Sequence, residues 1–372
     1  MAKASDQAQT ASPLRRGWTT GACATAATKA ALAALITGRF PDPVMITLPK
    51  GETPSFPLAR ENCSNTMASA SIVKDAGDDP DVTHGALITS TVRFLPAGCG
   101  IVFCAGEGVG TVTKEGLPVP VGEPAINPTP RAMMRQEVEA LCQSHVRAPN
   151  VEVTISVQDG EALAEKTWNG RLGIVGGLSI LGTTGVVHPF SCSAWIHSIH
   201  RGIDVARAAA YPRVIAATGS TSEDAAQRLY QLPETALIDM GDFAGGVLKY
   251  LRNHPVPAIT IAGGFAKLTK LAQGALDLHS GRSQVDFTFL CALAEANSSQ
   301  MTQTIKQQIQ TANTAAHVYE ITSNFGINLA QPVAERALMT AQNTLQGAPV
   351  DVEIMIVSKA GEIIARAGKR AP

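Results

Sequence analysis

Alternating and clustered apolar positions predict a strand-rich first half of the chain. Residues 151–157 (VEVTISV) alternate strictly between apolar and polar side chains, which is the period of a half-buried strand. Short apolar runs bounded by turn residues predict further strands at 44–48, 68–75, 86–94 and 100–104, and residues 160–168 also have a strand-like pattern. Runs of strands with few helices predict an α+β domain.

Two helices are predicted among these strands. Residues 22–37 are rich in alanine, with Thr19 or Thr20 as the N-terminal cap and Gly38 at the C-terminal end. Residues 131–145 form the second helix, after Pro130 at the first position that proline favours. The small side chains of the first helix predict very close packing against a sheet.

The hydrophobic rhythm changes after Ser191, where strands and helices begin to alternate. A helix at 192–210 is followed by strands at 213–219, 236–241 and 258–264, each leading into a helix, at 221–230, 243–253 and 265–276. This alternation predicts a parallel, doubly wound, Rossmann-like sheet. Further helices are predicted at 286–296, 299–315 and 330–345, and residues 352–358 and 362–368 predict a closing hairpin or edge pair. We therefore predict a disordered tail at 1–13 and domains at 14–190 and 191–372.

Composition excludes several classes of protein. The 372 residues carry 30 basic and 31 acidic side chains without a basic stripe, which argues against a nucleic-acid partner. The seven cysteines are odd in number and form no C-x-x-C, which favours a reduced cytoplasm. The polar start of the chain does not fit a signal peptide, and we expect no apolar run of membrane-spanning length.

A glycine-rich run at 170–185 is the most unusual stretch of the sequence. It holds six glycines among isoleucine, valine and leucine, with almost no charge. Glycine permits positive φ angles and close approach of a ligand, whereas such a run makes a poor helix and a poor strand. We expect a ligand to lie against Gly176 and Gly177, with Thr183 and Thr184 as polar contacts.

Three strand ends in the second half carry small or acidic residues that open helices. In an open parallel sheet, ligands bind outside the carboxyl ends of the strands. The candidate residues there are Thr218, Gly219 and Ser220, then Asp239, Gly241 and Asp242, and finally Gly263, Gly264 and Lys267. The sequence has neither a G-x-G-x-x-G fingerprint nor a G-K-[ST] phosphate loop, so no standard nucleotide motif explains them.

Two further segments contain candidate bases. Residues 73–81 place four aspartates close together, including Asp75 and Asp78, and crowding of like charges is expected to raise the pKa of one of them. Glu107 lies among glycines at 106–110, where a strand ends. The alternatives for these segments are a solvated acidic turn and a plain β-turn. The eight histidines show no metal-binding spacing, so no protein-bound metal is expected.

Several motifs together resemble the CbiD family of cobalt-precorrin-5B C1-methyltransferases. The resemblance extends from Leu14 onward and rests on residues 14–24 (LRRGWTTGACA), 73–83 (VKDAGDDPDVT), 106–117 (GEGVGTVTKEGL), 122–131 (GEPAINPTPR) and 169–189. It weakens in the second half, where the family often has G-H-x-G-K and this chain has Gly264-Phe265-Ala266-Lys267. The resemblance implies an S5-domain-2-like α+β domain followed by a Rossmann-like domain.

The same resemblance implies a reaction and its ligands. A methyl group would pass from S-adenosylmethionine to C1 of cobalt-precorrin-5B, giving cobalt-precorrin-6A in the anaerobic cobalamin pathway. The donor would bind at the three strand ends, and the cobalt-containing tetrapyrrole between the domains, against the glycine-rich run and Thr19, Thr20 and Gly21. The candidates for binding its carboxylates are Arg15, Arg16, Lys74, Arg131 and Arg171. Asp75, Asp78 and Glu107 are the candidate catalytic residues.

Two other functions and several properties remain open at this stage. The alternatives are a nucleotide-dependent small-molecule kinase and a non-catalytic corrinoid carrier with His188 as an axial ligand. A homodimer, the identity of any general base and the need for cobalt in the substrate are not fixed by the sequence.

Overall fold

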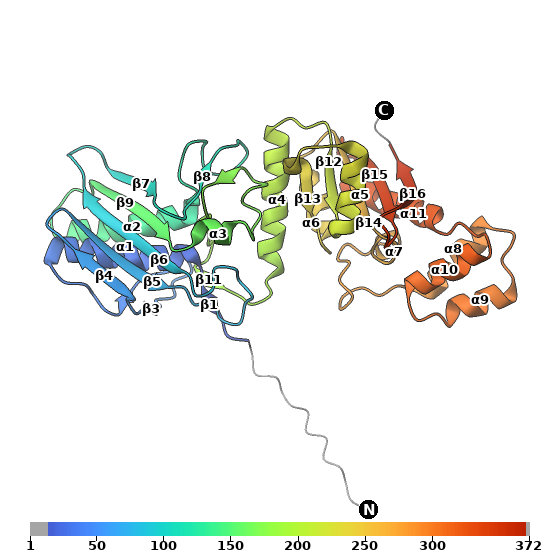
Figure 1. Cartoon of the computed structure of the whole chain (residues 1–372), viewed down its shortest axis with the longest axis horizontal. Helices are drawn as coiled ribbons and strands as arrows, with labels where there is room; N and C mark the ends of the chain where they lie inside the picture. Colours follow the sequence, from blue (N-terminus) through green and yellow to red (C-terminus); the bar gives the residue numbers. More distant parts are fainter. Residues whose placement is uncertain (1–13, 370–372) are drawn as a thin grey trace, which may run out of the picture. The chain divides into compact units, whose positions relative to one another are not determined.

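The computed structural model describes residues 14–369, so the predicted tail at 1–13 lies outside the described residues. The chain forms two compact units (Figure 1). The first contains the described residues through Thr113 together with Pro118–Ser191, and the second contains Lys114–Leu117 and the residues from Cys192 onward. Each unit has its own hydrophobic core.

The first unit is a two-layer α+β structure. Its main sheet has the order β4 (Arg60–Cys63), β5 (Met67–Val73), β6 (Leu87–Phe94), β9 (Val151–Val157) and β7 (Ile101–Ala105), and only the β7–β9 pair is parallel. The alternation of β9 is confirmed, because Val151, Val153, Ile155 and Val157 are buried and the residues between them are not. α1 (Thr20–Thr37) and α2 (Pro128–Ser144) lie on one face of the sheet (Figure 1).

Short strand pairs complete this unit around the main sheet. β1 (Gly17–Trp18) pairs with β11 (Val186–Val187), β2 (Val44–Met45) with β3 (Ser55–Phe56), and β8 (Thr111–Val112) with β10 (Ile174–Val175). The predicted strand at 44–48 is thus a pair of residues. The β1–β11 pair joins the first and last described segments of the unit.

Helix α1 is a buried core helix. Thr19 is its N-cap, where Oγ1 accepts a hydrogen bond from the Ala22 N–H (3.2 Å), and Gly38 ends it in a left-handed conformation (φ 76°). By length and hydropathy alone α1 could cross a membrane, so the expectation that no apolar run is long enough was wrong. However, 72% of it is buried inside the unit, as expected for a core helix of a globular domain.

The structure corrects three predicted elements. Residues 160–168 begin with a helix, α3 (Gly160–Ala164), because Asp159 turns the chain in a left-handed conformation (φ 56°) directly after β9. Helix α2 begins at Pro128 after the N-cap Asn127, so Pro128 takes the first-turn position assigned to Pro130. The predicted helix at 299–315 is two helices, α9 (Gln303–Gln310) and α10 (Ala315–Asn324), because Thr314 caps a new helix by accepting the His317 N–H (3.1 Å).

The second unit contains the predicted parallel sheet. Its strand order is β13 (Leu237–Asp239), β12 (Val214–Ala217), β14 (Ala258–Gly264), β15 (Asp351–Val357) and β16 (Ile363–Gly368), with only β16 antiparallel. The closing hairpin is therefore confirmed. A short 3-10 helix, η1 (Glu234–Ala236), precedes β13.

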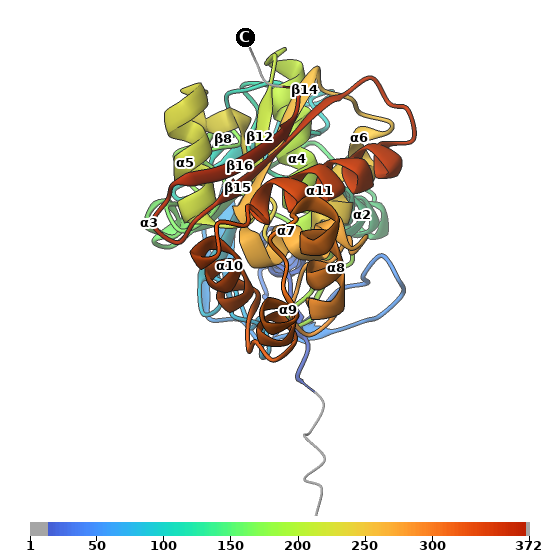
Figure 2. The same cartoon turned by 90° about the vertical axis from the view of Figure 1, so that its right-hand side faces the viewer.

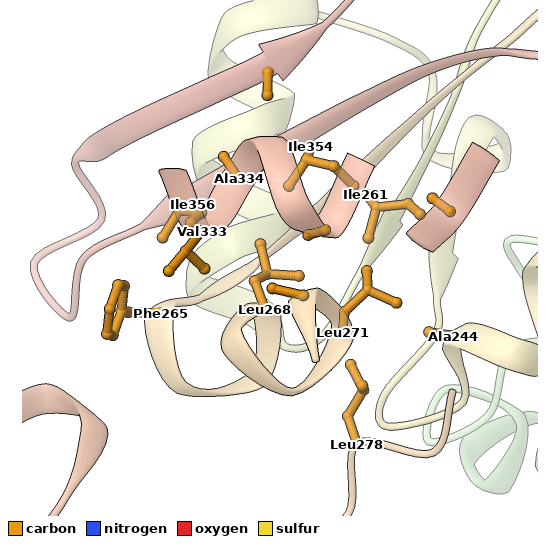
Figure 3. Close-up of a cluster of buried hydrophobic side chains, with 14 of the residues drawn as sticks. Ala244, Ile261, Phe265, Leu268, Leu271, Leu278, Val333, Ala334, Ile354 and Ile356 are labelled. Carbon is orange, nitrogen blue, oxygen red and sulfur yellow. The ribbon is translucent and has the colours of Figure 1, made fainter. Parts of the chain in front are cut away.

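Helices cover both faces of this sheet. α5 (Ser220–Tyr230) packs on one face, and α4 (Cys192–Ala208), α6 (Ala244–Leu251), α7 (Phe265–Ala272) and α11 (Ala330–Leu345) pack on the other. Figure 2 shows α5 and α11 on opposite sides of β15 and β16. α8 (Phe287–Asn297), α9 and α10 form a small helical group beside α7 and α11. In the core, Leu268 and Leu271 of α7 meet Val333 of α11 and Ile354 of β15 (Figure 3).

Candidate active site

The three predicted strand ends converge at the carboxyl edge of the sheet in the second unit. β12 lies between β13 and β14, with parallel register throughout. The chain winds outward in opposite directions from β12 and β14, which makes the gap between them a topological switch point, the usual ligand site in such sheets. Backbone hydrogen bonds join the ends, from Thr218 N–H to Ala262 O (2.9 Å) and from Met240 N–H to Ala217 O (2.9 Å).

Two glycines at this edge leave open space beside bare backbone. Gly219 and Gly264 are the N-caps of α5 and α7, and neither provides a side-chain cap. A Cβ added to either would meet no heavy atom within 4 Å, and neither residue has a left-handed φ. Because the first backbone N–H groups of a helix carry partial positive charge, this edge can bind carboxylate or hydroxyl oxygens.

The other small residues at the edge have structural reasons. A Cβ at Gly263 would lie 2.9 Å from the Thr218 side chain, and one at Gly241 would lie 3.3 Å from the Trp195 ring. The Asp239 carboxylate accepts the Gly241 N–H (3.2 Å), and the Trp195 indole donates to Asp239 O (3.1 Å). Trp195 is 44% exposed beside the site and was missed from the sequence, where a single tryptophan on a helix carries no positional signal.

Lys267 joins all three strand ends. Its ammonium donates to Thr218 O (2.9 Å) after β12 and lies 3.0 Å from Asp242 Oδ1 after β13, whereas Lys267 itself follows β14. This side chain therefore braces the edge from within the protein.

The glycine-rich run has a structural explanation in the first unit. A Cβ at Gly177 would lie 2.3 Å from the Gly108 carbonyl group, one at Gly182 would lie 2.3 Å from Thr19 Oγ1, and one at Gly185 would lie 2.5 Å from Leu48. Gly176 is exposed, with nothing within 4 Å of its Cβ position. The expected ligand is therefore not needed to explain Gly177, Gly182 or Gly185, because the chain's own atoms fill the space there.

The same run completes the start of α1. Leu181 O accepts the Gly21 N–H (2.8 Å), and Gly185 O accepts the Thr19 N–H (3.0 Å). Thr20 is buried, and a Cβ at Gly21 would lie 2.7 Å from Pro130. The Thr184 hydroxyl bonds the Val186 backbone, whereas Thr183 is exposed. Of the residues predicted to contact the tetrapyrrole here, Gly176 and Thr183 are open to solvent.

The acidic segment at 75–81 binds its own neighbours. The Arg15 guanidinium pairs with the Asp75 carboxylate through its two terminal nitrogens, and Asp78 Oδ2 accepts a hydrogen bond from the backbone N–H of Arg15 (2.6 Å). Asp79 accepts the Phe190 N–H (2.8 Å), and Asp81 pairs with the buried ammonium of Lys74. Each aspartate therefore holds one part of the first unit in place.

At Asp75 and Asp81, these contacts reverse the direction of the expected pKa shift. The hydrogen bond from Arg15 holds the pKa of Asp75 below its usual value. Burial would raise the pKa of Asp81, but the charge of Lys74 and hydrogen bonds from Lys74 and Thr83 outweigh burial and lower it. Charge pairing with the two cations, rather than crowding of like charges, decides the direction. A carboxylate with a lowered pKa is a weak base, which reduces the case for Asp75 as a general base.

Asp75 should therefore make unfolding sensitive to acid. Because its folded pKa lies below the unfolded value of 3.8, its contribution is present above that pH and is lost as the pH falls through the folded pKa. Asp75→Asn should cause a small drop in Tm at pH 7 and a shallower fall between about pH 5 and 3. Thermal melts across this range measure it. A variant curve parallel to that of the wild type would contradict the pairing, and Glu61→Gln on the exposed strand β4 is the control.

The remaining predicted site residues of the first unit each contact a different neighbour. Arg16 pairs with Glu52 (3.2 Å), and Arg131 donates to Ile126 O, Pro124 O and Glu123. Arg171 lies over the Trp168 ring (5.0 Å), and Glu107 is exposed. Their contacts make Arg131 a structural residue, whereas Arg171 and Glu107 keep exposed surface. Among residues 14–369, no group of three or more His, Cys, Asp or Glu side chains could hold a metal ion.

Comparisons with known proteins identify the family. The CbiD family model matches residues 7–189, and the model of the CbiD C-terminal domain matches residues 277–368. A cobalt-precorrin-5B C(1)-methyltransferase of Brucella anthropi is 65% identical over 97% of this chain and 98% of its own length. One of Brucella canis is 66% identical over 95% of each chain. The chain belongs to the CbiD family and is an enzyme of the methyltransferase class.

One solved structure is also similar. The crystal structure of the cobalamin biosynthesis protein CbiD from Archaeoglobus fulgidus is 24% identical, with a TM-score of 0.39, and covers 84% of this chain and 85% of its own. The family models confirm the family resemblance drawn from the sequence, and the five-stranded sheets of the two units confirm the α+β class.

Proposed function

We propose that this chain transfers the methyl group of S-adenosylmethionine to C1 of cobalt-precorrin-5B, giving cobalt-precorrin-6A. The observation that carries the proposal is the 65–66% identity over nearly full length to relatives named for this reaction. Those names favour a methyltransferase over the kinase and the corrinoid carrier. Seven free cysteines support a reducing compartment, the cytoplasm.

The switch-point edge of the second unit is the proposed donor site. Open space at Gly219 and Gly264 admits a ligand against backbone N–H groups, which can bind the donor's carboxylate. Asp239 lies at the end of β13, where a carboxylate can accept hydrogen bonds from ribose hydroxyls. Ser220, exposed at the start of α5, adds a hydroxyl beside Gly219. These residues fit a small zwitterionic nucleoside better than a triphosphate, because the lysine here is already engaged.

When bound, the donor supplies an electrophilic methyl group, whose bond to sulfur breaks as the ring carbon's electron pair forms the new bond. The chain has little proton chemistry to perform. Its task is to hold two reacting atoms in line and to exclude water, and this positioning can supply much of the rate enhancement. For the tetrapyrrole carboxylates, the half-buried Arg171 and the exposed Thr183 and Gly176 remain the candidates in the first unit.

Adding a side chain at Gly264 should block the donor without disturbing the fold. Gly264 has φ −70° and ψ 156°, which valine adopts readily, and no atom lies within 4 Å of the Cβ position. Gly264→Val should weaken S-adenosylmethionine binding at least tenfold in calorimetry, with Tm unchanged within about 2 °C. Methyl transfer to cobalt-precorrin-5B should fall in parallel.

The control is Gly170→Ala in the first unit, an exposed glycine that also has open space at its Cβ position. It should leave donor binding unchanged. Normal donor binding by Gly264→Val would exclude this edge as the donor site. A wild-type protein that binds S-adenosylmethionine but forms no methylated product would instead contradict the proposed reaction.

A further inference from the structure

We infer that Lys267 is a positioning residue whose salt bridge with Asp242 braces the donor site, and that the two charges of this pair cancel each other beside the donor's sulfonium. The inference rests on the proposed function and deepens it, because it assigns Lys267 a role other than direct contact with the donor.

The brace follows from where the three contacting groups lie. Lys267 is in the first turn of α7, directly after β14, and its ammonium reaches Thr218 O (2.9 Å) and Asp242 Oδ1 (3.0 Å). Thr218 immediately precedes Gly219, and its side chain packs on Gly263. Because Gly219 and Gly264 each have open space at the Cβ position and adjoin these groups, loss of the ammonium would free both strand ends at once.

The pair also sets the local charge. The side chains of Lys267 and Asp242 are only 36% and 23% exposed, so water screens them less than it screens surface charges. Together they carry no net charge. Removing the lysine leaves one negative charge beside the donor, and neutralising the aspartate leaves one positive charge.

The affinities of the donor and of its demethylated product respond differently to this charge. S-adenosylmethionine carries a cationic sulfur, whereas S-adenosylhomocysteine has a neutral one and otherwise nearly the same shape. A purely structural disturbance should weaken both ligands alike. An unbalanced charge should change the ratio of their affinities, and the direction should be opposite for the two variants.

Calorimetric titration of both ligands into the full chain tests this. Lys267→Met should weaken both ligands but favour S-adenosylmethionine in the affinity ratio by on the order of tenfold. Asp242→Asn should shift the ratio by a similar factor toward S-adenosylhomocysteine, and the double variant should return close to the wild-type ratio. Lys249→Met, at an exposed position of α6, should change neither affinity.

Each outcome decides the inference. Ratios that stay at the wild-type value, or that move the same way in both variants, would overturn it, even if both affinities fall. If Lys267→Met fails to fold, the ratio of Asp242→Asn alone decides, because that substitution keeps the size of the side chain. A wild-type protein that binds neither ligand would overturn the proposed donor site, and this inference with it.

Discussion

Gly177→Val is expected to unfold the first unit and abolish methyl transfer. The added Cβ would lie 2.3 Å from both carbonyl atoms of Gly108 and 2.7 Å from the Val109 nitrogen. These backbone atoms cannot move aside, because Leu178 N–H donates to Gly108 O and Gly110 N–H donates to Leu178 O, both at 2.9 Å. Relief of the clash must break this pairing, at a cost of at least about 3 kcal/mol.

Gly176→Ala separates packing from backbone strain. Its Cβ meets nothing within 4 Å, so only the left-handed φ of +86° disfavours alanine, by about 1 kcal/mol. Urea unfolding followed by circular dichroism should show no unfolding transition of the first unit for Gly177→Val. For Gly176→Ala the same transition should only shift to a lower urea concentration. If Gly177→Val unfolds like the wild type but has lost methyl transfer, then a ligand, and not Gly108, requires this glycine.

Glu353→Gln is expected to destabilise the second unit by about 3–5 kcal/mol. Glu353 is fully buried in β15, where its carboxylate lies 2.6 Å from Arg366 and 3.4 Å from Arg213. It also accepts hydrogen bonds from Thr260 (2.8 Å) and Tyr230, whose pKa is raised by burial and by that bond. Glutamine keeps the shape but leaves two guanidinium groups without their shared counter-charge.

Asp351→Asn is the matched control on the same strand. Asp351 pairs with Lys369, but both side chains are largely exposed, at 46% and 71%, so the pair adds little stability. The free energy of unfolding in urea measures both variants. A loss below about 1 kcal/mol for Glu353→Gln would show that the buried network is not required for stability.

The sequence predicted the layers of both units, and the structure shows why its site predictions were uneven. The periodicity of β9 and the strand–helix alternation after Ser191 depend on local pattern, and both are confirmed. Convergence of the three strand ends follows from the parallel sheet. The ion pair between Lys267 and Asp242 could not be foreseen, because side-chain partners across strand ends have no periodic signal.

The glycine-rich run shows a different limit. Composition reveals that something must approach the backbone at Gly177, but it cannot distinguish a ligand from the chain's own Gly108. The acidic segment is similar, because the sequence shows four neighbouring aspartates but not that Arg15 and Lys74 reach them. The partner of Gly177 is more than 60 residues away in the sequence. The partners of the aspartates are cations, and the fold decides which carboxylate each cation reaches.

The interlocking of the first unit's two ends has a consequence for its biosynthesis. The backbone N–H groups of Thr19 and Gly21 donate to Gly185 O and Leu181 O, and that of Asp78 donates to Arg15 O. Strand β1 pairs with β11 across almost the whole unit. A nascent chain therefore holds the N-terminus of α1 without its closing contacts until about residue 187 leaves the ribosome. Such non-local closure is slow, and the alanine-rich helix lacks these contacts meanwhile, so we expect this stretch to be the part of the first unit most prone to misfolding during synthesis.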